Sequence, residues 1–101
     1  FQPHLYSRTA NFADRFAEAL SLADDVVVTS VYAAREDPTP GVEGDLVTSR
    51  MDPARAQFVP DRFEAARALA ARARPGDLVM TVGAGDVTEL GPTILDRIGQ
   101  R

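Results

Sequence analysis

The 101-residue sequence contains no cysteine, no lysine and only one histidine, and each shortage excludes a class of chemistry. Without cysteine the chain can form no disulfide, no thiolate metal site and no cysteine nucleophile. Without lysine it cannot contain the Gly-x-x-x-x-Gly-Lys-Ser/Thr phosphate loop, so this segment cannot hydrolyse ATP by that route. Because there is one histidine and no cysteine, we expect no transition-metal site within these residues.

Long apolar runs and basic clusters are also lacking. No apolar stretch approaches the roughly 20 residues that a membrane-spanning helix needs, so we expect no membrane association. The formal net charge is −4 and no basic run interleaves with aromatic residues, which gives nucleic-acid binding no support. A cytoplasmic location agrees with the missing cysteine. With 45% hydrophobic and 26% charged residues, the sequence predicts a globular protein with a single domain over residues 1–101.

The stretch 76–89 has the pattern of a strand, a glycine turn and the start of a helix. Residues 78–82 are apolar and rich in β-branched side chains, which is typical of a central parallel strand buried on both faces. In open α/β sheets, ligands bind beyond the carboxyl ends of the strands, where a helix N-terminus offers free N–H groups. Gly83, Gly85 and Asp86 are therefore candidates for a nucleotide-binding or interdomain loop. A lone Gly-x-Gly is equally compatible with a tight turn that binds nothing.

Three other segments are predicted as strands: the β-branched run 26–32, the short run 57–59, and a strand that ends at Phe1, where Pro3 directs the chain out of the sheet. Strands that alternate with helices predict an α/β fold built from parallel β-α-β units. Because the chain starts inside a strand, we expect a piece of a longer polypeptide whose missing partners leave an exposed edge.

Helical periodicity predicts three main helices. The first begins among the polar residues 7–11, the second at the capping residue Asp61, and the third either at Asp86 or at Pro92. Residues 33–44 form a long loop of the kind that is often functional. The apolar faces of the first two helices are predicted to consist of Phe12, Phe16, Ala19, Leu20 and Ala23, and of Phe63, Ala66, Leu69, Ala70 and Ala73.

His4 and Arg8 are the strongest candidates for binding chemistry. Both are expected at the carboxyl edge of the sheet, where the turn at Gly83 also emerges, so that the two segments could line one cleft. Arginine can bind a carboxylate or phosphate through paired N–H donors, and histidine can donate a hydrogen bond or titrate near neutrality. Alternatively, His4 caps a loop and Arg8 pairs with an acidic residue at the helix start; spacing alone does not decide. Arg35 and Glu36 are predicted to be a solvated pair, with facing the cleft as the alternative.

Several motifs together resemble one family. They are Phe-Gln-Pro-His-x-Tyr-Ser-Arg-Thr at 1–9, Val-Tyr-x-Ala-Arg-Glu-x-Pro with Gly-Val-x-Gly at 31–44, and Gly-Asp at 76–77 followed by Gly-x-Gly-Asp at 83–86. In this order and spacing they are similar to the C-terminal domain of the Mur ligases, and in particular to the actinobacterial members of that family. The resemblance implies a Rossmann-like three-layer sandwich with a mostly parallel sheet, lacking its first strand and helix.

The resemblance also implies one domain of a three-domain, ATP-dependent ligase of peptidoglycan biosynthesis. Its substrates would be UDP-N-acetylmuramate and L-alanine, joined through an acyl phosphate. ATP and Mg²⁺ would be bound mainly by a central domain and the UDP sugar by an N-terminal domain, both outside these residues, so that this fragment would hold no cofactor and no catalytic residue and would be inactive alone. His4 and Arg8 match family positions near the incoming amino acid, with Arg8 facing its carboxylate. Leu5 stands where many relatives carry arginine.

Two other functions stay open. The chain could belong to another Mur-type ligase or a folylpolyglutamate synthase, which use the same C-terminal fold to form a different amide bond. It could also be a non-catalytic α/β module that binds a nucleotide or another anion by itself. A lysine-containing phosphate loop upstream of Phe1 would favour a ligase, and its absence would favour the module.

Overall fold

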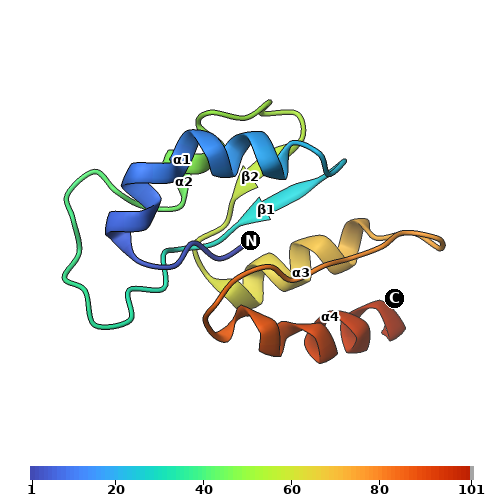
Figure 1. Ribbon diagram of the computed structural model, residues 1–101. Helices are drawn as coiled ribbons and strands as arrows, with labels where there is room; N and C mark the ends of the chain where they lie inside the picture. The colour runs from blue at the N-terminus through green and yellow to red at the C-terminus, as the bar shows by residue number, and fades with distance from the viewer. Residues whose placement is uncertain (101) are drawn as a thin grey trace.

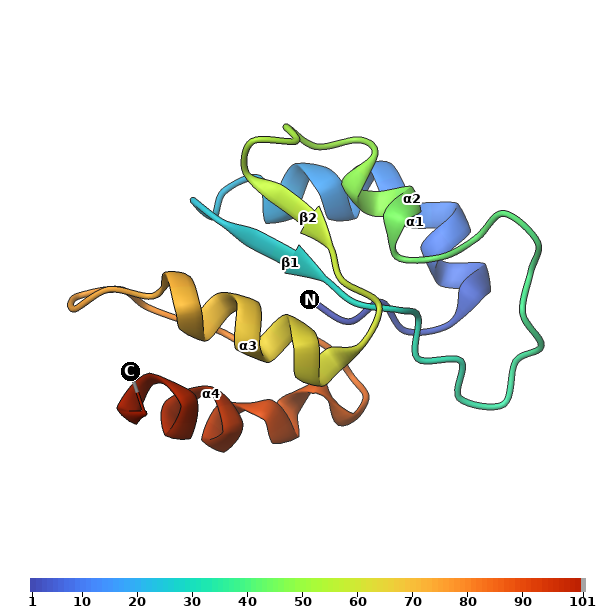
Figure 2. The ribbon, with the colours of Figure 1, turned by 180° about the vertical axis from the view of Figure 1, so that it is seen from behind.

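The computed structural model describes residues 1–100 as four α-helices, one short 3-10 helix and two strands. Their bounds in chain order are α1 Tyr6–Leu20, β1 Val26–Val28, α2 Asp45–Thr48, β2 Ala56–Phe58, α3 Arg62–Arg72, η1 Asp86–Glu89 and α4 Leu90–Gly99. β1 and β2 pair in parallel. Figures 1 and 2 both show α1 and α2 on one side of these strands and α3 and α4 on the other. The α/β class and the parallel pairing are confirmed, although the regular sheet is smaller than predicted.

Residues 1–5 extend the sheet along the far edge of β1 without forming a regular strand. Their backbone contacts begin at Phe1 and end at an isolated parallel bridge between His4 and Tyr32. Four hydrogen bonds of 2.8–3.0 Å join the segments: Phe1 N to Val27 O, Thr29 N to Phe1 O, Tyr32 N to Pro3 O and Leu5 N to Tyr32 O. The predicted strand at 26–32 is therefore regular only in β1, while its remainder still pairs with the N-terminal segment.

The predicted central strand at 78–82 does not form within the described residues 1–100. The segment has no regular structure, and Leu78 and Met80 are 85% and 65% exposed. One backbone hydrogen bond joins it to the N-terminal segment, from Gln2 N to Val82 O at 3.0 Å. In that register the earlier residues of 78–82 would pair with backbone preceding Phe1, and no described residue lies there. A β-branched run becomes a strand only where neighbouring backbone satisfies its N–H and C=O groups.

Two small apolar cores lie on opposite sides of the sheet. Ala13, Ala17 and Val47 join α1 to α2, whereas Ala66, Ala70, Val87, Leu90 and Ile94 join α3 to η1 and α4. The predicted faces are therefore only partly confirmed: Phe12 and Phe63 are 42% and 43% exposed, because the helices approach through small alanine side chains. None of the helices within residues 1–100 is both long and apolar enough to cross a bilayer.

The predicted start of α3 is confirmed, and the last predicted helix begins as a 3-10 turn that continues into α4. The Asp61 carboxylate accepts hydrogen bonds from the backbone N–H groups of Glu64 and Phe63, at 3.1 and 2.8 Å, and these bonds lower the pKa of Asp61. A 3-10 turn begins at Asp86, and α4 follows it. Pro92 lies in the first turn of α4, where a missing N–H removes no helical hydrogen bond.

Candidate functional site

The side chains predicted to bind a ligand come together beyond the carboxyl ends of the parallel segments. His4 ends the N-terminal segment, and its ring stacks on Tyr32, which follows β1, with ring centroids 5.8 Å apart and planes at 15°. The glycine turn reaches the same place, because a Cβ added to Gly85 would lie 2.7 Å from the Tyr32 ring. The predicted juxtaposition of the two segments is therefore present, with Tyr32 in contact with both.

His4 and Arg8 lie one helical turn apart and contact each other. Arg8 Nη1 lies 3.3 Å from His4 Nδ1. Because a guanidinium can only donate, Nδ1 is the acceptor, and in the neutral ring the proton is on Nε2. Within residues 1–100 Arg8 makes no ion pair, and the first turn of α1 carries no acidic side chain. The alternative in which Arg8 pairs with an acid at the helix start therefore does not apply, and its exposed guanidinium can bind an external anion.

Glu36, from the long loop after β1, covers the N-terminus of α1. Its carboxylate accepts a hydrogen bond from the Ser7 N–H at 3.0 Å and a second one from the Ser7 hydroxyl. These two bonds, from the hydroxyl first, lower the pKa of Glu36, and the nearby His4 adds to the effect. The predicted solvated pair of Arg35 and Glu36 is wrong, since Glu36 bonds to α1 and Arg35 makes no ion pair within residues 1–100. The N-terminus of α1 is therefore already occupied by a carboxylate of this chain.

Leu5 links His4 to α1 in a backbone conformation that residues with side chains rarely adopt, with φ of 69° and ψ of 136°. Three hydrogen bonds hold it: its N–H donates to Tyr32 O, and its carbonyl accepts from the N–H and the hydroxyl of Thr9. Strain of this kind costs about 1–3 kcal/mol and is found where the surrounding structure over-determines the backbone. It turns the chain so that α1 starts immediately after His4.

Gly83 and Gly85 are required by close packing. A Cβ on Gly83 would lie 2.7 Å from a methyl of Val87 and 3.0 Å from the Gln2 carbonyl oxygen. A Cβ on Gly85 would lie 2.7 Å from Gln2 Oε1 and 2.7 Å from the Tyr32 ring. The turn therefore needs glycine to approach the N-terminal segment and Tyr32. Contacts within the chain account for both glycines without a ligand.

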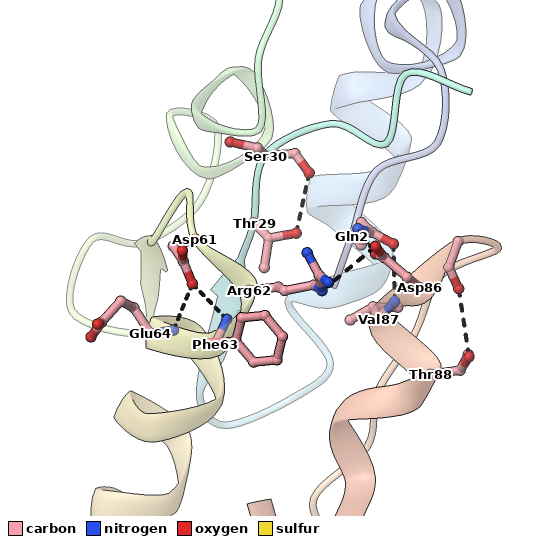
Figure 3. A network of polar contacts seen from close by, with 11 residues as sticks. Gln2, Thr29, Ser30, Asp61, Arg62, Phe63, Glu64, Asp86, Val87 and Thr88 are labelled. Atoms are coloured by element: carbon pink, nitrogen blue, oxygen red, sulfur yellow. Dashed lines mark hydrogen bonds and ion pairs between the residues drawn. The ribbon is translucent and has the colours of Figure 1, made fainter. Parts of the chain in front are cut away.

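The Asp86 carboxylate is held by two side chains, Gln2 and Arg62, which reach it from the N-terminal segment and from the start of α3 (Figure 3). Gln2 Nε2 donates to Asp86 Oδ1 at 2.7 Å, and Arg62 Nε lies 3.5 Å from Asp86 Oδ2. Gln2 Oε1 accepts from the Val87 N–H at 3.2 Å. A phosphate needs free N–H donors and positive potential, whereas this turn offers a carboxylate and an N–H that is already bonded. The Asp86 carboxylate and the Val87 N–H are thus both used within the chain.

Comparison with known families adds to this geometry. The family model for the Mur ligase glutamate ligase domain matches residues 2–85. This chain belongs to that family. The matched part of this Mur ligase domain includes His4, Arg8 and the turn as far as Gly85.

Individual relatives match over nearly the whole chain. The chain is 57% identical over 99 residues to the UDP-N-acetylmuramate–L-alanine ligase of Thermobifida fusca (strain YX), and the match covers 98% of this chain and 21% of that protein. It is 57% identical over 98 residues to the ligase of the same name from Rhodococcus erythropolis (strain PR4), covering 97% and 19%. Identity to the one from Streptomyces avermitilis is 50% over 103 residues, covering 100% and 22%. The chain thus spans about a fifth of the length of these relatives.

Proposed function

We propose that this domain forms the amino-acid side of the active site in a longer, ATP-dependent ligase that adds L-alanine to UDP-N-acetylmuramate through an acyl phosphate in peptidoglycan biosynthesis. The observation that carries the proposal is the Arg8 guanidinium, which is exposed beside His4 and has no acidic partner within residues 1–100. Relatives named for this reaction, 50–57% identical over almost the whole chain, support it. The reaction is proposed to take place in the cytoplasm.

Arg8 would bind the carboxylate of the incoming amino acid. Its planar set of N–H donors matches a carboxylate, and a hydrogen bond to a charged group contributes about 1.5–3 kcal/mol. His4 takes one donor of Arg8 on Nδ1 and so limits the rotation of the guanidinium. With Nδ1 accepting from Arg8, His4 serves to orient the guanidinium that binds the amino acid. The domain contributes by positioning and by closing the site against water.

ATP and Mg²⁺ would be held by other parts of the longer protein. When bound, ATP supplies the phosphoryl group that activates the muramic carboxylate. Because the turn at Gly83, Gly85 and Asp86 carries a carboxylate and packs against Gln2 and Tyr32, we assign it as an interdomain loop beside the amino acid. The central ATP-binding domain and the N-terminal UDP-sugar domain are thus proposed as the partners of this domain within one chain.

We also propose that residues 78–82 become a central strand in the longer protein, which completes a Rossmann-like three-layer sandwich with a mostly parallel sheet. The bond from Gln2 N to the end of this segment sets a parallel register for backbone that precedes Phe1. Val79 lines a groove of about 390 Å³ against α4. Since side chains alternate along extended backbone, Met80 faces the opposite way. A strand and a helix before Phe1 would cover that face.

Phosphate release by the full-length protein tests the activity. The protein is given ATP and UDP-N-acetylmuramate with L-alanine, glycine, L-serine or D-glutamate in turn. We expect release that requires the UDP sugar and is greatest with L-alanine. Greatest release with D-glutamate would favour another Mur-type ligase, and no release with any pair would favour the non-catalytic module.

Replacing Arg8 tests the site. In the full-length protein, Arg8→Ala should raise the KM for L-alanine about 10- to 100-fold, because one charge-assisted contact is lost. The KM for UDP-N-acetylmuramate should not change. Arg35→Ala is the matched control, since it removes an exposed arginine of the loop after β1 that makes no ion pair within residues 1–100. An unchanged alanine KM in Arg8→Ala would refute the assignment.

A further inference from the structure

We propose that Gln2 is a positioning residue of this site: it holds the glycine turn against Tyr32 and thereby fixes the ring on which His4 lies. The proposal rests on the proposed function, because it concerns how the same amino-acid site is ordered. It adds a residue that does not itself face the amino acid. The effect would pass from Gln2 through the turn and Tyr32 to His4 and Arg8.

The Gln2 side chain is buried, and both ends of its amide are used. The residue is 6% exposed, its Nε2 donates to Asp86 and its Oε1 accepts from the Val87 N–H (Figure 3). The Oε1 contact also satisfies an N–H of the first turn of η1, which has no side-chain cap of its own. A carboxylate at this position would repel Asp86, and an apolar side chain would leave a buried N–H without a partner. The amide supplies the donor and the acceptor on two separate atoms of one side chain.

The turn that Gln2 holds is packed against the Tyr32 ring. At Gly85 a Cβ would meet ring atoms of Tyr32 at 2.7 and 2.8 Å. The Tyr32 backbone is fixed by hydrogen bonds with Pro3 and Leu5 on the neighbouring segment. Tyr32 is 38% exposed, so burial alone does not fix its ring. The turn and the stacked His4 ring are therefore the contacts that limit its orientation.

Loosening the turn should consequently affect amino-acid binding more than any other step. If the turn moves away, the Tyr32 ring can rotate and His4 loses the surface on which it stacks. His4 then no longer limits the orientation of Arg8, with which it shares a side-chain hydrogen bond. The expected signature is a higher KM for L-alanine with an unchanged KM for the UDP sugar.

The test exchanges the two polar partners in the full-length protein. Gln2→Glu places two carboxylates side by side and should raise the alanine KM about tenfold, the effect of losing one charge-assisted hydrogen bond. Hydrogen exchange at residues 83–89, measured by mass spectrometry, should become faster. In the double variant Gln2→Glu with Asp86→Asn, amide and carboxylate have changed places, so the bond re-forms with its donor reversed. Both measurements should return toward those of the unmodified protein.

Two further variants complete the design. Gln57→Glu makes the same change at an exposed glutamine of β2 that bonds to Arg72, and it should alter neither measurement. Gly85→Ala displaces the turn from its other contact and should raise the alanine KM even if Gln2→Glu fails to fold. Gly91→Ala, where an added Cβ meets nothing within 4 Å, is its control.

The outcomes separate the two proposals. Gln2→Glu that speeds exchange at the turn but leaves the alanine KM unchanged would show a purely structural role and overturn the positioning role. A double variant that folds but does not recover would also overturn it, as would an equal rise in the KM of every substrate. If the unmodified protein shows no alanine-dependent turnover, the proposed function itself fails, whatever Gln2→Glu does to exchange.

Discussion

Residues 1–5 and 78–82 lie next to each other in the structure and behave in opposite ways. The first segment contains Pro3 and has weak strand character, yet four backbone hydrogen bonds join it to the chain at and beyond β1. The second is a β-branched apolar run, yet it makes one such bond and leaves Leu78 85% exposed. The difference teaches that an available neighbour, rather than strand propensity, decides which segment joins a sheet.

The same comparison explains why the apolar run is found in the sequence at all. A central parallel strand needs a paired strand on each side and a covering layer on each face. Within residues 1–100, the segment 78–82 has α4 near one face and no cover for Met80 on the other. Its apolar composition is therefore not matched by the cover that it has within residues 1–100.

The largest expected effect separates the chain from the longer protein. Met80→Asp should leave the stability of the 101-residue chain nearly unchanged, because Met80 is 65% exposed. In the longer protein the same substitution should lower the free energy of unfolding by about 3–5 kcal/mol, since it buries an unpaired charge. Denaturant unfolding of both proteins measures the difference. Equal effects in the two proteins would contradict the proposed central strand.

The next effect concerns the start of the N-terminal segment. In the 101-residue chain, burial lowers the pKa of the Phe1 amine from 8.0 to about 6. Between these values the unfolded chain binds more protons than the folded one, so the free energy of unfolding should rise from pH 6 to pH 8, by at most about 3 kcal/mol. Below pH 6 both states are protonated and this contribution is constant. Thermal unfolding across this range checks the prediction, and acetylation of the amine should remove this contribution. A slope that survives acetylation would have another origin.

The smallest of the three effects compares the two segments by cavity formation. Val28→Ala in β1 should lower the free energy of unfolding of the chain by about 2–3 kcal/mol, because Val28 is fully buried. Leu78→Ala removes a larger side chain from the segment 78–82 and should change stability by no more than about 0.5 kcal/mol. Urea unfolding midpoints of the two variants give the comparison. Similar losses in both would mean that the two segments are equally buried.

Sequence reasoning placed His4 and Arg8 beyond the carboxyl ends of the parallel segments, where the structure has them, because parallel segments deliver the residues after their ends to one edge. It did not find their surroundings. The bond from Ser7 to Glu36 spans 29 residues, and the bond from Gln2 to Asp86 spans 84, so neither leaves a pattern in local sequence. Pairing Glu36 with its sequence neighbour Arg35 was wrong for the same reason. Side-chain partners across a fold depend on packing distances that spacing along the chain does not contain.

Helices were easier to predict than their buried faces. Periodicity and the capping residue Asp61 located α3 because both signals are local. The burial of Ala13 and Ala17 in place of Phe12 depended on how closely α1 approaches α2, which is a property of two helices together. The strained Leu5 also escaped prediction, since hydrogen bonds from both sides of the site impose its positive φ.

The sequence by itself determined the α/β class, the positions of the main helices, the exclusion of cysteine and phosphate-loop chemistry, and the segment that carries His4 and Arg8. Each of these depends on composition, on local periodicity or on the direction of parallel strands. Only the tertiary structure decided that 78–82 stays outside the regular sheet, that the glycine turn packs on Gln2 and Tyr32, and that Arg8 keeps no acidic partner within residues 1–100. Each of these outcomes depends on which distant segments come into contact, and such contacts exist only in the folded chain.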